Sequence, residues 1–532
     1  MSIRIPCTAR IALITLMLAT ANSLAVADMV YHRGNPGEAE TLDPHKTATV
    51  PESDILYDLF EGLVTYDAKA NIVPGVAESW SANAQGTVYT FVLRDSAKWS
   101  NGDPVTAADF VYSFRRLMSP ETGAKYANIL YTLKNGESVN KGTAKVEDLG
   151  VRALDEHHLE ITLESPAPYF IAQLAHQTGL PVHSASLEKF GKEFLKPGNL
   201  ISNGPFQLSD YIPNDHLTAI KNPHYWDAQH VRIDREIFYP IEDRSAGLRR
   251  FQAGEIDTYN DVPIDQIKFI RQTLKEQFRV APYLGTYYFV FNTKRPPFND
   301  VRVRQALSMV VDREFLAEQI WGGTMVPAYS FIPPGVSNYD EPATLPYKDA
   351  SPIDREERAK ELLQVAGFGP GGHKLSVEIR YNTSENHKST AIALADMWKP
   401  LGVVTTFTNT DLKTHYAFLR DKGDFEVARA GWIADYSDAQ NFLFLLQSDN
   451  GGLNYANYAN AEFDDLMQKA AREPDLKRRA ILLHKSEAIA MRDEPYLTLL
   501  FYGSKNLVSP KVSGWESNVL DRHFARYLAI LP

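Results

Sequence analysis

The chain has 532 residues, 66 acidic against 55 basic side chains, and a formal net charge of −11 at pH 7. This acidic balance argues against binding to nucleic acid or to anionic membranes. The single cysteine, Cys7, lies within the first ten residues. Once those residues are removed, cysteine catalysis, disulfides and thiolate metal sites are excluded.

The N-terminus has the pattern of an export signal. Arg4 and Arg10 precede an apolar run over residues 11–24, and Ala25-Val26-Ala27 is an A-x-A cleavage pattern. We expect cleavage after Ala27, giving a soluble periplasmic protein that begins at Asp28. An uncleaved anchor helix is the alternative, but the run is short of the ~20 apolar residues that span a bilayer. The remaining length suits about three domains.

The first part of the mature chain predicts a mixed α/β fold. Residues 53–63 place apolar residues on one face of a helix, which we expect Ser53 to cap. Residues 88–93 alternate between the two faces of a strand. A turn at residues 100–104 follows, and Thr106 is expected to cap the next helix. We expect these elements to be scaffold.

Three patterns bear on cofactors, metals and catalysis. Residues 367–372 fit G-x-G-x-x-G by letter but follow a predicted helix and contain Pro370, which indicates a helix end and turn rather than a dinucleotide site. His157 and His158 lie in a charged turn without metal-ligand spacing. Neither H-E-x-x-H nor G-x-S-x-G occurs. The sequence therefore predicts no cofactor, no metal and no catalytic residue.

The most informative stretch is residues 425–442. A mostly apolar run predicts a buried strand that leads into a loop, with Arg429 inside the run and Asp435 at its end. A charge beside a buried strand is costly unless a group of opposite charge pairs with it. By itself, the pattern indicates either an internal ion pair or Asp435 as a simple turn residue.

Residues 428–435, A-R-A-G-W-I-A-D, resemble a segment of the periplasmic oligopeptide-binding proteins of bacterial ABC importers, solute-binding protein family 5. L-D-P-H at residues 42–45, V-P-E-S at residues 50–53 and the stretch 74–114 resemble the same family. The likeness spans essentially the whole mature chain. It implies an α/β fold of the periplasmic-binding-protein type II-like kind (cluster C), with two lobes, a hinge and three domains.

The resemblance also implies how the chain is divided. We expect a discontinuous domain I of residues 28–60, 184–284 and 503–532, a domain II of residues 61–183, and a domain III, the second lobe, of residues 285–502. The aromatic and β-branched run at 283–292 predicts a strand, and with residues 500–505 it is expected to cross between the lobes. Two such crossings form a hinge, so closure needs few backbone torsions to change.

The site residues are implied by the resemblance. Asp435 would hold the α-ammonium of a peptide, and the strand of Gly431, Trp432 and Ile433 would hydrogen-bond its backbone. A carboxylate and a free strand edge suit a zwitterionic peptide whatever its side chains. The other expected ligand-binding residues are Ala48, Thr49 and Val50 on the opposite side, Tyr126, Tyr283 and Gly285.

Three cationic or titratable residues are implied for the far end of the ligand. His387, Arg420 and Arg429 would meet the carboxylate end of peptides of different lengths. Several cations along one cleft would let it hold chains that end at different depths. Taken alone, His387 is typical of a helix start and Arg420 of a solvated charge.

Four positions depart from the family pattern. Leu412 replaces a tryptophan that stacks on ligand side chains, Ala48 and Val290 replace acidic pocket residues, and Trp321 replaces a cationic residue. The pockets lose two negative charges and become more apolar, so lysine-rich peptides should lose an advantage. We expect a peptide binder with a shifted side-chain preference.

The function expected from the sequence is that of an extracytoplasmic solute-binding subunit of an ABC transporter. It would be a monomer that captures short peptides and delivers them to a membrane permease and its ATPase subunits. The alternatives are a receptor for cell-wall (murein) peptides, or one for a nonpeptide solute such as haem, a metal chelate or a sugar acid. A periplasmic peptidase is disfavoured because the catalytic motifs are missing.

Overall fold

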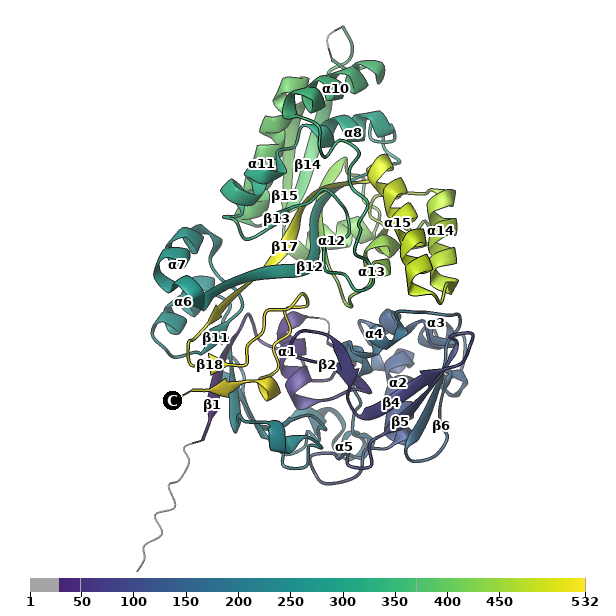
Figure 1. Cartoon of the computed structure of the whole chain (residues 1–532), viewed down its shortest axis with the longest axis vertical. Helices are drawn as coiled ribbons and strands as arrows, with labels where there is room; N and C mark the ends of the chain where they lie inside the picture. Colours follow the sequence, from purple (N-terminus) through teal and green to yellow (C-terminus); the bar gives the residue numbers. More distant parts are fainter. Residues whose placement is uncertain (1–27, 48, 370, 532) are drawn as a thin grey trace, which may run out of the picture.

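The computed structural model describes residues 28–47, 49–369 and 371–531. It has two lobes, one above the other in Figure 1, joined by two long strands that run between them. The predicted export signal, residues 1–27, and Ala48 lie outside the described residues. Within the described part of the chain, no helix is both long and apolar enough to cross a membrane.

One large mixed sheet runs through both lobes, in the strand order β15-β14-β16-β12-β17-β11-β1-β10-β9-β8, and β13 also pairs with β17. The lower lobe contributes β1 (Val30–Asn35), β8 (Phe206–Ile212), β9 (His216–Lys221), β10 (Arg235–Pro240) and β11 (Thr258–Tyr259). The upper lobe contributes β13 (Val326–Pro327), β14 (Ser376–Asn382), β15 (Val404–Thr410) and β16 (Val427–Ile433).

The crossing strands β12 (Phe278–Phe291) and β17 (Tyr496–Val508) join the two halves of this sheet. They pair antiparallel along their length, but the register breaks between Pro282 and Thr286. Such an irregularity interrupts the ladder and lets a strand bend and twist locally. The two crossings expected at residues 283–292 and 500–505 coincide with these strands, except that β12 ends at Phe291.

A second, four-stranded sheet of the lower lobe has the order β4-β5-β7-β6. Its strands are β4 (Ala77–Ala82), β5 (Val88–Leu93), β6 (Val151–Ala153) and β7 (His158–Thr162), and two short pairs are β2 (Val64–Tyr66) with β3 (Ile72–Pro74) and β18 (Val512–Ser513) with β19 (Ala529–Ile530). The predicted alternation in β5 is confirmed, because Tyr89, Phe91 and Leu93 are buried and the residues between them are half-buried.

Helices cover the sheets on both lobes. The lower lobe carries α1 (Val50–Leu59), α2 (Ala107–Met118), α3 (Gly136–Asn140), α4 (Phe170–Leu174), α5 (Ser184–Phe190), α6 (Arg244–Gln252) and α7 (Ile267–Leu274). The upper lobe carries α8 (Val301–Met309), α9 (Arg313–Phe315), α10 (Pro352–Val365), α11 (Glu385–Trp398), α12 (Leu412–Arg420), α13 (Gln440–Leu443), α14 (Ala461–Arg472) and α15 (Leu476–Asp493).

The predicted helix caps are partly right. Thr106 caps α2, with its hydroxyl and its backbone N–H both donating to Asp109. The expectation that Ser53 caps α1 is wrong. The helix begins at Val50 and Thr49 is its N-cap, in a capping box with Glu52. Ser53 lies inside the first turn, where its hydroxyl donates to the Val50 carbonyl at 2.9 Å.

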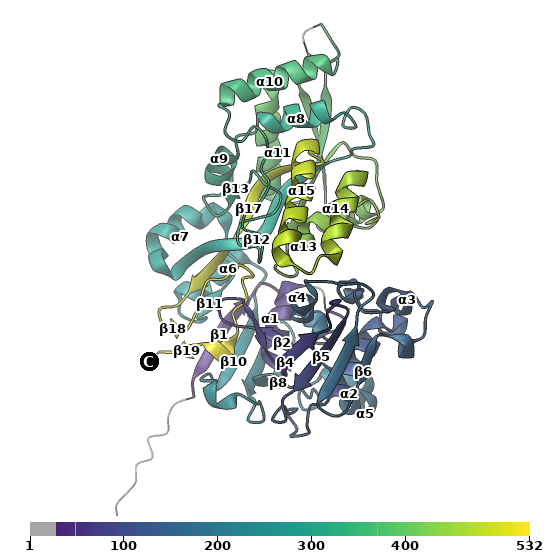
Figure 2. The ribbon, with the colours of Figure 1, turned by 45° about the vertical axis from the view of Figure 1, so that its right-hand side comes forward.

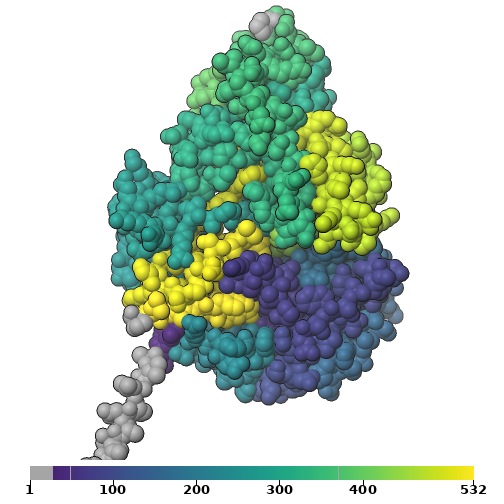
Figure 3. Space-filling model, viewed as in Figure 1, coloured from purple at the N-terminus to yellow at the C-terminus, as the bar shows by residue number. Residues whose placement is uncertain are grey.

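The C-terminal segment closes the front of the lower lobe. In the space-filling view of Figure 3 its yellow residues lie beside the purple N-terminal elements, below the upper lobe. The Asn518 amide donates to the carbonyl of Ala68, and Arg526 forms a buried ion pair with Glu61 at 2.7 Å. The end of the chain is thereby brought next to α1.

The lobes also touch through an aromatic contact away from the crossing strands. Tyr169, which precedes α4, stacks on Tyr436 with ring centroids 5.8 Å apart. The Arg479 guanidinium lies 5.4 Å from the Tyr169 ring and is itself fixed by two hydrogen bonds to Asp438, of 2.8 and 2.7 Å. Figures 1 and 2 both show α13 of the upper lobe above α4 of the lower lobe.

Tyr169→Ala should favour a more open arrangement of the lobes. The substitution removes one aromatic pair and one cation–π contact, together about 1–2 kcal/mol that only the closed arrangement gains. We expect a larger radius of gyration in small-angle X-ray scattering. Tyr112→Ala, on the outer face of α2, is the control and should leave that radius unchanged. Equal radii for both variants would contradict a role for Tyr169 in holding the lobes together.

Candidate ligand-binding cleft

A cavity of about 240 Å³ lies between the lobes and is walled by residues from both. Its upper wall is the end of β16 and the loop after it. Its lower wall combines the start of α1, the segment after α4, Tyr126 and the C-terminal segment. The lining residues are Thr49, Val50, Ser53, Tyr57, Tyr66, Tyr126, His176, Gln177, Tyr283, Trp432, Ile433, Ala434, Asp435, Leu520 and Arg522.

The upper wall is held by backbone and amide hydrogen bonds. Ile433 pairs with Gly285 of β12, and the Ala434 N–H donates to the Leu284 carbonyl at 2.8 Å. Asn441 accepts two hydrogen bonds on one oxygen, from the Trp432 indole at 3.1 Å and from the Asp435 N–H at 3.0 Å. These contacts fix the turn that points Asp435 into the cavity.

Asp435 is a carboxyl without an ion-pair partner among the described residues. Burial between the lobes raises its pKa to about 7, although Asn441 and the positive charge of Arg522 lower it in part. Burial removes water that would stabilise the ionised carboxylate. A cation that binds beside the carboxylate replaces that stabilisation. Asp435 is therefore suited to receive a positively charged group of a ligand.

The lower wall is polar and aromatic. The Tyr126 ring stacks on His176 with centroids 5.7 Å apart. The negative charge of Asp435 is the largest cause that raises the pKa of Tyr126, and burial adds to it, so the phenol lies close to the carboxyl. Burial also raises the pKa of Tyr283. These phenols stay protonated at neutral pH and can donate hydrogen bonds to a ligand.

Seven of the residues expected from the sequence line this cavity together: Thr49, Val50, Tyr126, Tyr283, Trp432, Ile433 and Asp435. Gly431 and Gly285 lie in the strands behind the wall. A Cβ on Gly285 would stand 2.4 Å from Ile433 Cδ1 and 2.8 Å from Tyr502 Cδ2, so glycine allows the close approach of β12 to β16. Ala48 lies outside the described residues.

The three residues expected at the far end of a ligand do not line this cavity. Arg429 is buried, and its guanidinium donates to Asn382 at 3.1 Å and to the hydroxyls of Tyr416 and Tyr502 at 3.0 and 2.9 Å. His387 Nδ1 lies 3.1 Å from the Tyr287 hydroxyl. Burial, with the charges of Arg429 and His415, lowers the pKa of His387 to about 2, so its ring is neutral. Arg420 is exposed at the end of α12.

The positions that depart from the family pattern differ in placement. Leu412 is 57% exposed at the start of α12. Trp321 is buried, and its indole donates to the Thr390 hydroxyl at 3.2 Å. Val290 has no exposed surface because β16 and β17 flank it at Ala428 and Tyr496. The expectation that Val290 lines a pocket is therefore wrong in this structure.

The sequence reasoning missed about half of the cavity wall: Ser53, Tyr57, Tyr66, His176, Gln177, Leu520 and Arg522. Most of these residues sit in segments with no recognisable site motif. Arg522 offered no local signal, since Asp521, His523 and Arg526 surround it in the sequence. Only the folded chain shows that this segment reaches the cleft.

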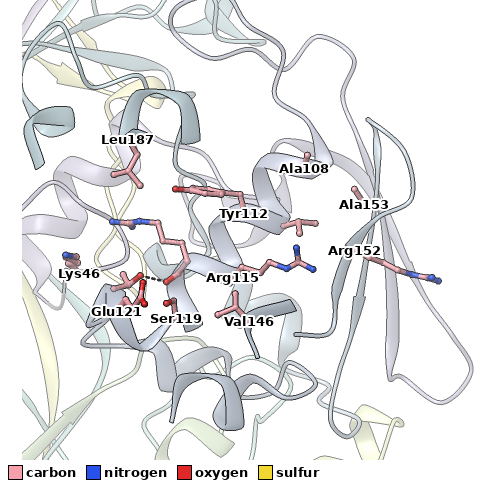
Figure 4. Close-up of a pocket in the computed structure, with 13 residues that line it drawn as sticks. Lys46, Ala108, Tyr112, Arg115, Ser119, Glu121, Val146, Arg152, Ala153 and Leu187 are labelled. Carbon is pink, nitrogen blue, oxygen red and sulfur yellow. Dashed lines mark hydrogen bonds between the residues drawn. The ribbon is translucent and has the colours of Figure 1, made fainter. Parts of the chain in front are cut away.

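The larger hollow in Figure 4, about 840 Å³, lies on the lower lobe around α2 and is not the candidate site. Two of its cationic side chains already form ion pairs, Arg116 with Asp43 at 2.6 Å and Arg152 with Glu160 at 2.7 Å. The upper lobe contributes nothing to its lining. In the part of the chain that the structure describes, no group of three or more His, Cys, Asp or Glu residues could hold a metal ion.

Comparison with known proteins agrees with the fold. Residues 71–454 match the bacterial extracellular solute-binding proteins, family 5, middle region. The periplasmic oligopeptide-binding protein of Salmonella typhimurium is 39% identical over 507 residues, which cover 94% of this chain and 92% of that protein. The periplasmic murein peptide-binding protein of Escherichia coli is 39% identical over 484 residues, covering 90% and 89%.

A solved structure with the same architecture is the unliganded open form of a periplasmic murein tripeptide-binding protein. It superposes with a TM-score of 0.84 at 38% identity, covering 95% of this chain and 98% of that one. The α/β fold with two lobes and a hinge, expected from the sequence, is confirmed. The chain belongs to family 5 of the bacterial extracellular solute-binding proteins.

Proposed function

We propose that this protein captures short peptides in the cleft between its lobes and delivers them to the permease of an ABC importer. The single observation that carries the proposal is the half-buried carboxyl of Asp435 at the end of β16, which faces the lower lobe and has no ion-pair partner among the described residues. The α-ammonium of a peptide is a cation of the required size and charge. Relatives named for oligopeptide and murein peptide binding support this reading.

The backbone of β16 supports the same ligand class. On one side, residues Gly431–Ile433 pair with β12. On the other side, the described pairing with β14 covers only Val427 and Ala428. The later residues of β16 therefore present an edge to which an extended peptide can add as a further strand. Main-chain hydrogen bonds of this kind give affinity without selecting a side chain.

The mechanism we propose is closure around the ligand. A peptide that contacts Asp435 on the upper lobe and residues 49–50 on the lower lobe stabilises the closed arrangement over the open one. The register break in β12 is the natural place for the hinge torsions. We further propose the domain division at residues 60/61, 183/184, 284/285 and 502/503, and recognition of the closed form by the permease and its ATPase subunits.

Binding rather than catalysis is the proposed role, in the periplasm. Periplasmic relatives support the compartment. Cleavage after Ala27 remains part of the proposal, as do the terminal contacts of His387, Arg420 and Arg429. A dedicated receptor for murein peptides is the second candidate, and the structural similarity to a murein tripeptide-binding protein favours it specifically.

Native mass spectrometry of the protein purified from periplasm without denaturation tests the proposal. Released ligands should form a mixture of short peptides. A single murein peptide would select the second candidate. A nonpeptide compound as the bound species would contradict peptide capture, and the same spectra report whether the mature chain begins at Asp28.

Asp435→Ala should weaken peptide binding by about 2–5 kcal/mol, because a buried charge pair is lost and the ammonium is left without a partner. Isothermal titration calorimetry with a bound peptide identified above measures the change. Asp449→Ala, an exposed carboxylate of the same lobe, is the matched control and should bind as the wild type does. Unchanged affinity in Asp435→Ala would refute the assignment.

Peptide affinity should fall as the pH drops below about 7. The ammonium binds the ionised carboxylate, and the pKa of Asp435 in the free protein is about 7. Protonation then competes with the ligand and costs about tenfold in affinity per pH unit at lower pH. Above about 8 the peptide amine itself loses its charge. Calorimetry from pH 5.5 to 8 should show this slope in the wild type and not in Asp435→Ala; affinity that rises toward pH 5.5 would contradict it.

A further inference from the structure

A second charged group, Arg522, lines the same cavity as Asp435 but comes from the opposite lobe. It lies in the C-terminal segment, after β17 has returned to the lower lobe. Its side chain is 17% exposed. The guanidinium is held in place by a hydrogen bond from Nη1 to the Ser53 hydroxyl at 2.5 Å, and it lies 5.1 Å from the centre of the Tyr57 ring.

The charge of Arg522 is only weakly neutralised by the protein. Among the described residues, the carboxylate within ion-pair distance of Arg522 is Asp54, which is 3.8 Å away and makes a closer ion pair with Arg33 at 3.2 Å. Among the described residues, Nε and Nη2 of Arg522 donate no hydrogen bond to any side chain or carbonyl. A planar guanidinium with free donors is the group best shaped to hold a carboxylate.

The charges of Arg522 and Asp435 interact electrostatically, although the two side chains form no ion pair. The positive charge of Arg522 lowers the pKa of Asp435 and that of His176. Both charges also perturb the pKa values of Tyr57, Tyr66 and Tyr283. The cavity is thus lined by an anionic and a cationic group from opposite lobes that form no ion pair with one another.

This arrangement has a consequence for what can bind. An ammonium placed at Asp435 lies within reach of the repulsive field of Arg522. A ligand that brings a carboxylate to the same end removes that repulsion and satisfies the free guanidinium donors. Peptides with a neutral first side chain leave the Arg522 donors to water.

We propose that Arg522 forms a carboxylate subsite beside Asp435, so that the cleft selects peptides whose first residue carries a carboxylate as well as the α-ammonium. The inference rests on the proposed function and specifies its ligand class. Two chemistries supply such a residue. One is an acidic side chain on an ordinary α-linked peptide. The other is a γ-linked glutamyl residue, whose own α-carboxylate stays free.

Calorimetry with four tripeptides tests the subsite: Glu-Ala-Ala, γ-Glu-Ala-Ala, Gln-Ala-Ala and Ala-Ala-Ala. The wild type should bind at least one of the two acidic peptides about tenfold or more tightly than Gln-Ala-Ala. The tighter of the two identifies the linkage. In Arg522→Gln this preference should disappear. In Arg522→Lys, which keeps the positive charge but not the planar pair of N–H donors, the preference should be intermediate.

The outcomes separate the two proposals. If Gln-Ala-Ala binds the wild type and neither acidic peptide has an advantage, the carboxylate subsite is refuted and peptide capture stands. If none of the four peptides binds, peptide capture itself is refuted. A preference that persists in Arg522→Gln also overturns the role of Arg522. Thermal unfolding monitored by circular dichroism verifies that each variant is folded. If Arg522→Gln does not fold, the peptide preferences of the wild type and of Arg522→Lys still test the carboxylate subsite.

Discussion

The antiparallel pairing of β12 with β17 is the interaction on which the rest of the structure depends. It carries one hydrogen-bonded sheet from the lower lobe into the upper lobe, and its register breaks between Pro282 and Thr286. A continuous ladder would make the two lobes one rigid body. The break keeps them connected while leaving a few residues whose torsions are not fixed by the ladder. The cleft lies beside this point, so motion at the hinge acts directly on its walls.

The lower wall of the cleft is set by buried charges behind it. Arg33 lies 3.2 Å from Asp54 and 3.7 Å from both Asp58 and Glu236. Burial raises the pKa of Asp58 to about 6 and that of Glu236 well above its usual range, so one arginine need not balance three full negative charges. Asp54 and Asp58 belong to α1, whose first turns face the cavity. The network therefore holds α1 against the sheet and fixes the wall that a ligand meets.

The cleft itself leaves its polar groups poorly compensated. Asp435 has no ion-pair partner in the described part of the chain. Arg522 shares the carboxylate of Asp54, 3.8 Å away, with Arg33. Other buried charges are either paired closely, as with Arg479 and Asp438 or Arg526 and Glu61, or hold several hydrogen bonds, as Glu487 does. Uncompensated charge is costly in a protein interior. Its concentration at the junction of two movable lobes is the physical mark of a binding site, because a ligand can supply the missing partners.

The sequence by itself determined the local elements and one half of the site. The apolar run of β16 and the charge that ends it predicted both a strand and Asp435 at its end, and the alternation of β5 and the Thr106 cap were right because each depends on neighbouring residues. What only the tertiary structure decided depends on residues far apart in the chain. Val290 is enclosed by β16 and β17, and His387 is neutral because burial and the charge of Arg429 lower its pKa. Arg522 reaches the same cavity as Asp435 only because β17 returns the chain to the lower lobe, through a long-range pairing that no local pattern encodes.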